Sequence, residues 1–217
     1  MEIYLIRHTA PAVAKGVCYG QADLDVTASF YGEAAIIQQY LPADIKVVYS
    51  SPLQRCKRLA DHLFTAHTIQ LHDGLMEINC GRWELQKWDD IPTGELDPWM
   101  KDLINVSIPG GESYLEIFDR VVKVFDQIIA PTPTEGTGEA SVLQGSEGQF
   151  PLAIVAHGGV IRSILSHITQ TPLADSFKAF SLHYGCVIKV TGKSGSLRYD
   201  VLSNIPREKE THKPSNL

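Results

Sequence analysis

The chain has 217 residues, of which 44% are apolar and 20% charged, with a formal net charge of −6 and a pI of about 5.7. This is the composition of an ordinary globular protein, which disfavours disorder and fibrous repeats. The acidic balance lacks the basic footprint of nucleic-acid-binding proteins, so nucleic acid is not an expected partner. An anionic ligand would need a local cationic site.

Cysteine usage and hydropathy indicate a cellular compartment. The cysteines Cys18, Cys56, Cys80 and Cys186 are widely scattered and form no CxxC pair. Their spacing predicts buried thiols rather than a zinc cluster or a disulfide framework. Apolar runs are too short for a signal-peptide core or a membrane span. We therefore expect a cytoplasmic protein that does not bind membranes.

Short apolar runs alternate with helical patterns along the chain. The predicted buried strands occupy residues 2–6, 46–50 and 152–156. The helices predicted from apolar spacing occupy residues 27–41, 53–64 and 112–129. Short apolar strands suit a covered parallel sheet, and their alternation with helices predicts a three-layer α/β/α sandwich. Two β-rich runs within 185–204 predict a hairpin at the edge of this mostly parallel sheet.

The chain is expected to form a single domain over residues 1–205. Residues 131–150 are rich in Pro, Thr, Gly, Ser and Glu and lack periodicity, which predicts a mobile loop insertion rather than a domain boundary. Residues 206–217 read as a polar tail. No pattern fixes the oligomeric state, and a homodimer is one option.

Polar residues follow the ends of the predicted parallel strands. The first strand is followed by Arg7 and His8, and the last by His157 and two glycines. Ligands of open α/β sheets bind at the carboxyl edge of the strands, so both imidazoles are expected in one crevice. The helix after the second strand holds Arg55 in its first turn, at the same edge.

Arginine is suited to phosphate, because its planar fork donates two hydrogen bonds and keeps its charge at physiological pH. Arg7 and Arg55 therefore predict a site for a phosphate dianion. Taken singly, each arginine could be an ordinary solvated residue and each histidine an ordinary strand cap. Their joint occurrence at three strand ends favours the site.

Glu77 stands among the apolar residues Leu75, Met76 and Ile78 at the start of the run "LMEINCGRWE", residues 75–84. Among apolar neighbours Glu77 would be desolvated, which favours proton donation near neutral pH. The alternative is an exposed residue on an edge strand.

Five motifs together resemble those of a known family. In chain order they are "LIRHTAP", "YSSPLQR", "LMEINCGRWE", "PGGES" and "VAHGGVIR". Each is weak alone, but their order and spacing are similar to the histidine phosphatase superfamily, also called the phosphoglycerate mutase-like family. The match runs from the first strand to about Tyr184. It leaves out the segment 131–150 and the tail.

The resemblance implies a role for each candidate residue. His8 would be the nucleophile that takes the phosphoryl group, while Arg7, Arg55 and His157 bind its oxygens. Glu77 would protonate the leaving alcohol and then activate water. Fixed cations stabilise the charge in this scheme, so no metal or cofactor is required.

The chain departs from the family pattern directly after the nucleophile. Thr9 stands where the family usually has glycine, and Ala10 and Pro11 replace the acidic or amide residue and the hydroxyl that commonly follow. The five core groups are nevertheless all present. We therefore expect an active enzyme.

The segment 16–30 after the first strand is expected to border the pocket. Tyr19 and Gln21 could bind substrate by stacking and hydrogen bonding, and Gly158 is expected to line the same pocket. The alternative is an ordinary connecting loop. The RHTxP and CYGQ forms look like those of α-ribazole phosphatases, which would make a small phosphate ester, α-ribazole 5′-phosphate of cobalamin biosynthesis, the substrate.

Three other functions stay open. A cofactor-dependent phosphoglycerate mutase would shield its phosphohistidine from water with additional pocket-covering segments. A non-catalytic phosphate-binding regulatory module would keep the anion site without turnover. A metal hydrolase would use some of the eight histidines, although neither HxH nor HExxH spacing occurs.

Overall fold

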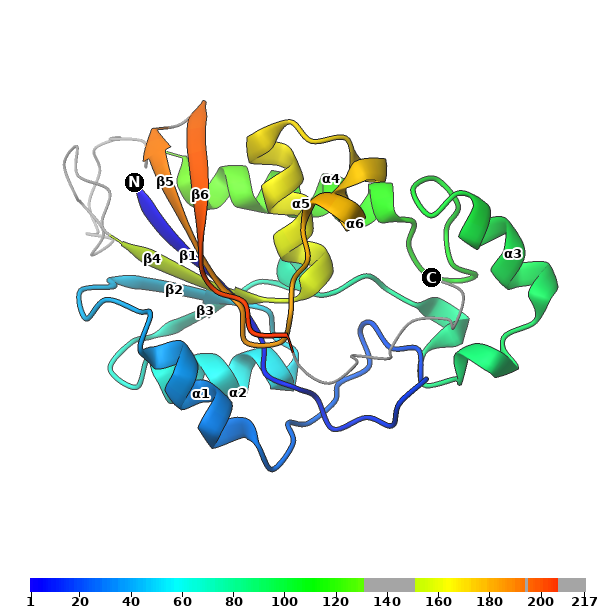
Figure 1. Ribbon diagram of the computed structural model, residues 1–217, viewed down its shortest axis with the longest axis horizontal. Helices are drawn as coiled ribbons and strands as arrows, with labels where there is room; N and C mark the ends of the chain where they lie inside the picture. The colour runs from blue at the N-terminus through cyan, green and yellow to red at the C-terminus, as the bar shows by residue number, and fades with distance from the viewer. Residues whose placement is uncertain (131–150, 194, 207–217) are drawn as a thin grey trace, which may run out of the picture.

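A six-stranded sheet forms the centre of the computed structural model, which describes residues 1–130, 151–193 and 195–206 (Figure 1). The strands are β1 (Glu2–Arg7), β2 (Val47–Ser50), β3 (Ile69–Leu71), β4 (Leu152–Ala156), β5 (Val187–Lys193) and β6 (Ser196–Ser203). Their spatial order is β3-β2-β4-β1-β5-β6. The segment predicted as an insertion, 131–150, and nearly all of the predicted tail lie outside the described residues.

Strand direction and register bring the predicted site residues to one edge. β1, β2 and β3 run parallel to their neighbours around β4, and Arg7 of β1 pairs with Ala156 of β4. His8 and His157 therefore leave the sheet side by side. β5 runs antiparallel to β1 and forms a hairpin with the edge strand β6. The predicted mostly parallel sheet with an edge hairpin is confirmed.

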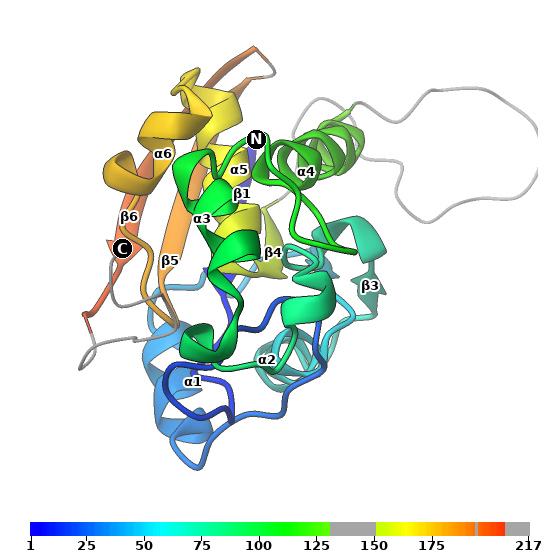
Figure 2. The same cartoon turned by 90° about the vertical axis from the view of Figure 1, so that its right-hand side faces the viewer.

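Helices cover both faces of the sheet (Figure 2). The α-helices are α1 (Phe30–Gln38), α2 (Gln54–Leu63), α3 (Thr93–Lys101), α4 (Tyr114–Ile129), α5 (Gly158–Thr169) and α6 (Leu173–Ala179). The 3₁₀ helices are η1 (Asp73–Leu75), η2 (Gly81–Trp83) and η3 (Trp88–Asp90). α1 and α2 lie on one face, and α4 and α5 on the other. The three-layer architecture is confirmed.

Alternation along β1 divides the apolar interior into two cores. Ile3 and Leu5 pack into the core shared with α4 and α5, whereas Tyr4 and Ile6 face the core shared with α1 and α2. Successive side chains of a strand point to opposite faces, and each fully buried aliphatic side chain contributes roughly 1.5–3 kcal/mol. This anchoring holds the end of β1 in place.

Two helices begin later than predicted. α1 begins at Phe30 with Ser29 as its N-cap, and not at residue 27. α4 begins at Tyr114, and not at residue 112, because Ser113 and Glu116 form a reciprocal capping box. The box satisfies two amides of the first turn, which fixes the helix start at Ser113.

A small third core lies beside the sheet, under the segment that includes η2, η3 and α3. It contains Cys18, Cys80, Trp83, Trp88, Ile91 and Ile108. The four cysteines are buried free thiols, as predicted. Within the described residues, the helices are all too short or too polar to cross a bilayer.

Candidate active site

The end of β1 places an imidazole ring in the interior of the protein. His8 is 2% exposed and His157 is fully buried, and the centroids of their rings are 5.1 Å apart. His8 Nδ1 lies 2.7 Å from the carbonyl oxygen of Thr9. A carbonyl oxygen only accepts, so Nδ1 carries the proton, and the lone pair of the neutral ring is on Nε2. This tautomer can act as a nucleophile through Nε2.

The next residue along the chain after His8 is Thr9, which carries a hydroxyl group. Thr9 is fully buried, and its Oγ1 has no hydrogen-bond partner among the described residues. Among the described non-glycine residues, only Leu85 and Gln170 have positive φ. The loop conformation after His8 is therefore open to threonine, and the departure from the family glycine requires no strained backbone.

Arg7 lies over the start of α5. Its Nη1 donates a 2.6 Å hydrogen bond to the carbonyl of Leu182, and its guanidinium lies 4.0 Å from the ring centroid of Tyr184. A Cβ added at Gly158 would lie 3.3 Å from Arg7 Nε. The expected pocket residue Gly158 thus gives the arginine room above the helix.

Arg55, in the first turn of α2, is fully buried. Its Nη1 donates to the carbonyl of Ala22 at 2.8 Å and its Nη2 to the carbonyl of Gly20 at 2.5 Å. Its Nε is buried without a hydrogen-bond partner among the described residues. A buried charged donor of this kind is suited to an anionic ligand.

The carboxylate of Glu84 holds the loop that orients Arg55. It accepts hydrogen bonds of 2.7–3.1 Å from the amides of Gly20, Gln21 and Ala22, and a further one of 3.1 Å from Cys80. The backbone amides of the loop 20–22 therefore point to Glu84. Two carbonyls of the same loop, those of Gly20 and Ala22, point to Arg55.

His157 is enclosed by neutral partners and nearby cations. Its Nε2 lies 2.8 Å from Ser51 Oγ and 3.4 Å from Cys56 Sγ. Burial, reinforced by the positive charges of Arg55 and Arg7, holds the pKa of His157 well below its usual value. Burial also raises the pKa of Cys56 to about 12. The histidine is therefore neutral, and the cysteine is a thiol.

Glu77 comes from the irregular segment between η1 and η2. Its Oε2 accepts a 3.1 Å hydrogen bond from the amide of Gly159, in the first turn of α5, and its Oε1 accepts one of 3.0 Å from Ile78. A Cβ added at Gly159 would lie 2.2 Å from Glu77 Oε1. The glycine is what lets this half-buried carboxylate reach the positive end of the helix.

The two expected substrate contacts lie at the same place. The hydroxyl of Tyr19 is 2.5 Å from that of Tyr184, and burial raises the pKa of Tyr19 well above its usual value, so the phenol stays protonated. The guanidinium of Arg55 lies 5.5 Å from the ring centroid of Tyr19. Gln21 donates its side-chain amide to the carbonyl of Glu77 at 3.0 Å.

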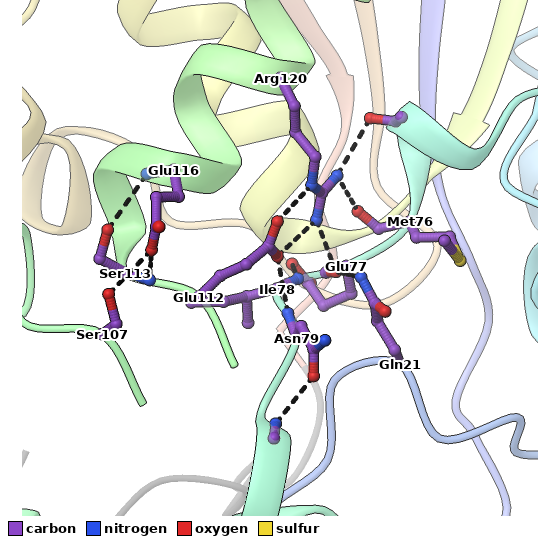
Figure 3. Close-up of polar contacts among 12 residues, drawn as sticks. Gln21, Met76, Glu77, Ile78, Asn79, Ser107, Glu112, Ser113, Glu116 and Arg120 are labelled. Carbon is purple, nitrogen blue, oxygen red and sulfur yellow. Dashed lines mark hydrogen bonds and ion pairs between the residues drawn. The ribbon is translucent and has the colours of Figure 1, made fainter. Parts of the chain in front are cut away.

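For three residues near the site, no motif predicted that they would be site residues. Tyr184 lies just before β5, and the next residue, Gly185, donates its amide to the carbonyl of His8. Glu84 stands in the quoted run "LMEINCGRWE", but only its contacts reveal its function. Arg120 lies on α4 and contacts the segment of Glu77 (Figure 3). Within the described residues, no three His, Cys, Asp or Glu side chains are grouped as metal ligands.

Comparison with known proteins identifies the family. The model of the histidine phosphatase superfamily (branch 1) matches residues 3–205. The probable phosphoglycerate mutase GpmB of Salmonella choleraesuis is 29% identical over 180 residues, which cover 79% of this chain and 76% of that protein. The chain belongs to the histidine phosphatase superfamily, as its motifs predicted.

Solved structures share the fold at low sequence identity. The α-ribazole phosphatase from Shigella flexneri has a TM-score of 0.79 and 20% identity, with 96% of this chain and all of that chain covered. A mycobacterial glucosyl-3-phosphoglycerate phosphatase has a TM-score of 0.72 and 20% identity, with 93% and 96% covered. These likenesses concern the fold.

Proposed function

We propose that the protein is a metal-independent phosphomonoester hydrolase that acts through a phosphohistidine on His8. The observation that carries the proposal is the hydrogen bond from His8 Nδ1 to the Thr9 carbonyl, 2.7 Å long, which leaves the lone pair on Nε2. Neutral His157 has its ring centroid 5.1 Å from that of His8, and Arg7 and Arg55 come from the same edge of the sheet. These three side chains would bind the oxygens of the phosphoryl group.

The proposed reaction has two displacements at phosphorus. Nε2 of His8 forms a P–N bond as the ester P–O bond breaks, and Glu77 donates a proton to the departing alkoxide. In the second step Glu77 takes a proton from water, whose oxygen attacks phosphorus. The P–N bond breaks, and inorganic phosphate leaves the regenerated histidine.

We further propose α-ribazole 5′-phosphate as the ester. Support comes from the CYGQ loop, whose Tyr19 offers an aromatic face beside Arg55, where a planar base could stack while its phosphate meets the guanidinium. Two of the similar folds belong to proteins described as α-ribazole phosphatases. A panel of phosphomonoesters that includes this compound tests the choice, and a higher kcat/KM for another ester would overturn it.

The reaction class is tested with His8→Ala. Wild-type protein should release phosphate from p-nitrophenyl phosphate and, when quenched during turnover, should carry an acid-labile phosphoryl group. His8→Ala should lose both while keeping its unfolding temperature. His62→Ala is the matched control, because His62 is exposed and packs against Phe30 and Tyr31 away from the site. Phosphate binding without any phosphate release by the wild type would favour a non-catalytic module instead.

A mutase is the competing function, because curated relatives at 29% identity are described as probable phosphoglycerate mutases. A mutase should isomerise 3-phosphoglycerate, in the presence of its bisphosphate cofactor, far faster than it hydrolyses either compound. We expect the opposite: hydrolysis without acceleration by the bisphosphate.

A further inference from the structure

The chain around Glu77 belongs to neither a helix nor a strand, so its main-chain groups need other partners. One side chain supplies several of them. Arg120 of α4 donates to three carbonyl oxygens, at 3.1 Å for Gly74, 2.7 Å for Met76 and 2.8 Å for Glu77 (Figure 3). The segment therefore depends on α4 for its conformation.

All five N–H donors of Arg120 are engaged. Besides the three carbonyls, Nε and Nη2 donate to the two carboxylate oxygens of Glu112 at 2.7 and 2.9 Å. Glu112 Oε2 also accepts a 2.8 Å hydrogen bond from the amide of Asn79. The pair, whose side chains are 23% and 20% exposed, thus holds the main chain on both sides of Glu77. A planar, five-donor group suits this arrangement, which lysine cannot reproduce.

This arrangement reaches the carboxylate of Glu77 through one peptide group. The carbonyl of Glu77 and the amide of Ile78 belong to the same rigid plane. Arg120 Nη2 and Gln21 Nε2 hold the carbonyl, while the amide donates to Glu77 Oε1 at 3.0 Å. When the carbonyl is fixed, the direction of the amide is fixed, and with it the carboxylate that the amide binds.

We infer that Arg120, paired with Glu112, is a positioning residue that aims the carboxylate of Glu77 for proton transfer. The inference rests on the general-acid role proposed for Glu77. Misplacement of an acid by about 1 Å can cost on the order of 10²-fold in rate. That loss falls on esters whose leaving groups need a proton, and spares activated aryl esters.

The experiment compares leaving groups in Arg120→Met and Arg120→Lys. The first variant removes all donors and keeps much of the stem; the second keeps the charge with three donors, so that one folded variant remains if the other is unstable. We expect kcat for an alkyl phosphate to fall on the order of 10²-fold, and kcat for p-nitrophenyl phosphate to change less than about 3-fold. Arg82→Met is the control, because Arg82 is 66% exposed and pairs with Glu95, also at the surface of the described part of the chain.

Glu77→Gln separates this inference from the proposed function. It should show the same leaving-group-dependent loss, and Arg120→Met added to it should cost little more, because both changes remove one proton transfer. Two results would overturn the positioning role while Glu77→Gln shows the selective loss. Either Arg120→Met slows both esters equally, or the double variant loses the product of the two single losses. If Glu77→Gln lacks the selective loss, the acid role itself is wrong, and the role of Arg120 falls with it.

A purely structural function of Arg120 predicts a different result. It would lower the unfolding temperature and slow both esters alike. Hydrogen exchange gives a readout independent of activity, because the amides of Ile78 and Asn79 should exchange faster in Arg120→Met than in Arg82→Met. Unchanged exchange at these amides would overturn the inference.

Discussion

Two adjacent glycines at the start of α5 decide how closely charged groups approach this helix. Gly158 faces the guanidinium of Arg7, and Gly159 faces the carboxylate of Glu77, with 3.3 and 2.2 Å left to an added Cβ. A side chain at either place would separate a charged group from the amides of the helix end. The chemistry of the site therefore depends on the absence of a Cβ atom at Gly158 and at Gly159.

Gly159→Ala should separate activity from stability. Its methyl group would displace the ends of two side chains, Glu77 and Ile117, and not the backbone. Alanine is favoured over glycine inside a helix by roughly 0.5–1 kcal/mol. We expect an unchanged or raised unfolding temperature together with a loss on the order of 10²-fold in turnover of alkyl phosphates.

Gly32→Ala in α1 is the matched control, because a Cβ there meets nothing within 4 Å. It should stabilise the protein and leave turnover as it was. If Gly159→Ala retained full activity on alkyl phosphates, Glu77 would not need its place at the helix end.

At the scale of elements, the site is built by loops that bind one another. The loop 20–22 lies between Glu84, which takes its amides, and Arg55, which binds its carbonyls. The segment around Glu77 lies against α4 in the same way. Neither loop has a regular structure of its own, so buried and half-buried charged side chains replace the hydrogen bonds that a sheet would supply.

Glu84→Gln should weaken both the fold and the proposed phosphate site. Each oxygen of the Glu84 carboxylate accepts from two amides. A glutamine side chain has one accepting oxygen, so two of these four amides would lose their acceptor and face an N–H₂ group. We expect roughly 2–4 kcal/mol of lost stability, measured by urea unfolding, and a higher Kd for inorganic phosphate.

Asp61→Asn makes the same change of charge at an exposed pair with Lys57 and should leave the unfolding midpoint and the phosphate Kd nearly unchanged. Equal effects of the two variants would show that Glu84 acts only through its charge.

The sequence could predict the strand ends, because short apolar runs mark the strands and ligands of open α/β sheets bind at their carboxyl edge, which places Arg7, His8 and His157 together. It could not predict α3, which has no buried residue and contains Pro98, or α5, most of whose residues are buried. The strand β3 has three residues, too few for a sequence pattern to indicate it. Arg120 acts on a segment more than forty positions away in the chain, and no local pattern reports such a contact.

On the scale of the whole molecule, the site places a neutral histidine at the centre of the protein. The unfolded chain protonates His157 near its ordinary pKa of 6.5, whereas the folded protein, in which burial lowers this pKa, does not. The unfolded state therefore binds more protons below that pH. The stability from His157 is present above pH 6.5 and is lost as the pH falls below it.

The unfolding free energy should thus fall between pH 6.5 and 5, with a slope from this residue approaching about 1.4 kcal/mol per pH unit. His157→Gln removes the titrating group and should flatten the profile by that amount, while the contributions of other histidines remain in both proteins. Parallel profiles for the two proteins would contradict the buried neutral state.

Arg55 is oriented by partners that do not neutralise it. Carbonyl oxygens hold its guanidinium, whereas Arg120 nearby is paired with a carboxylate. Positive charge therefore persists inside a protein whose net charge is −6. In the proposed reaction, the cations that attract the ester also face the phosphate that is left behind. Departure of that phosphate, and not cleavage of the ester, would then set the pace, and the enzyme would slow as phosphate accumulates around it.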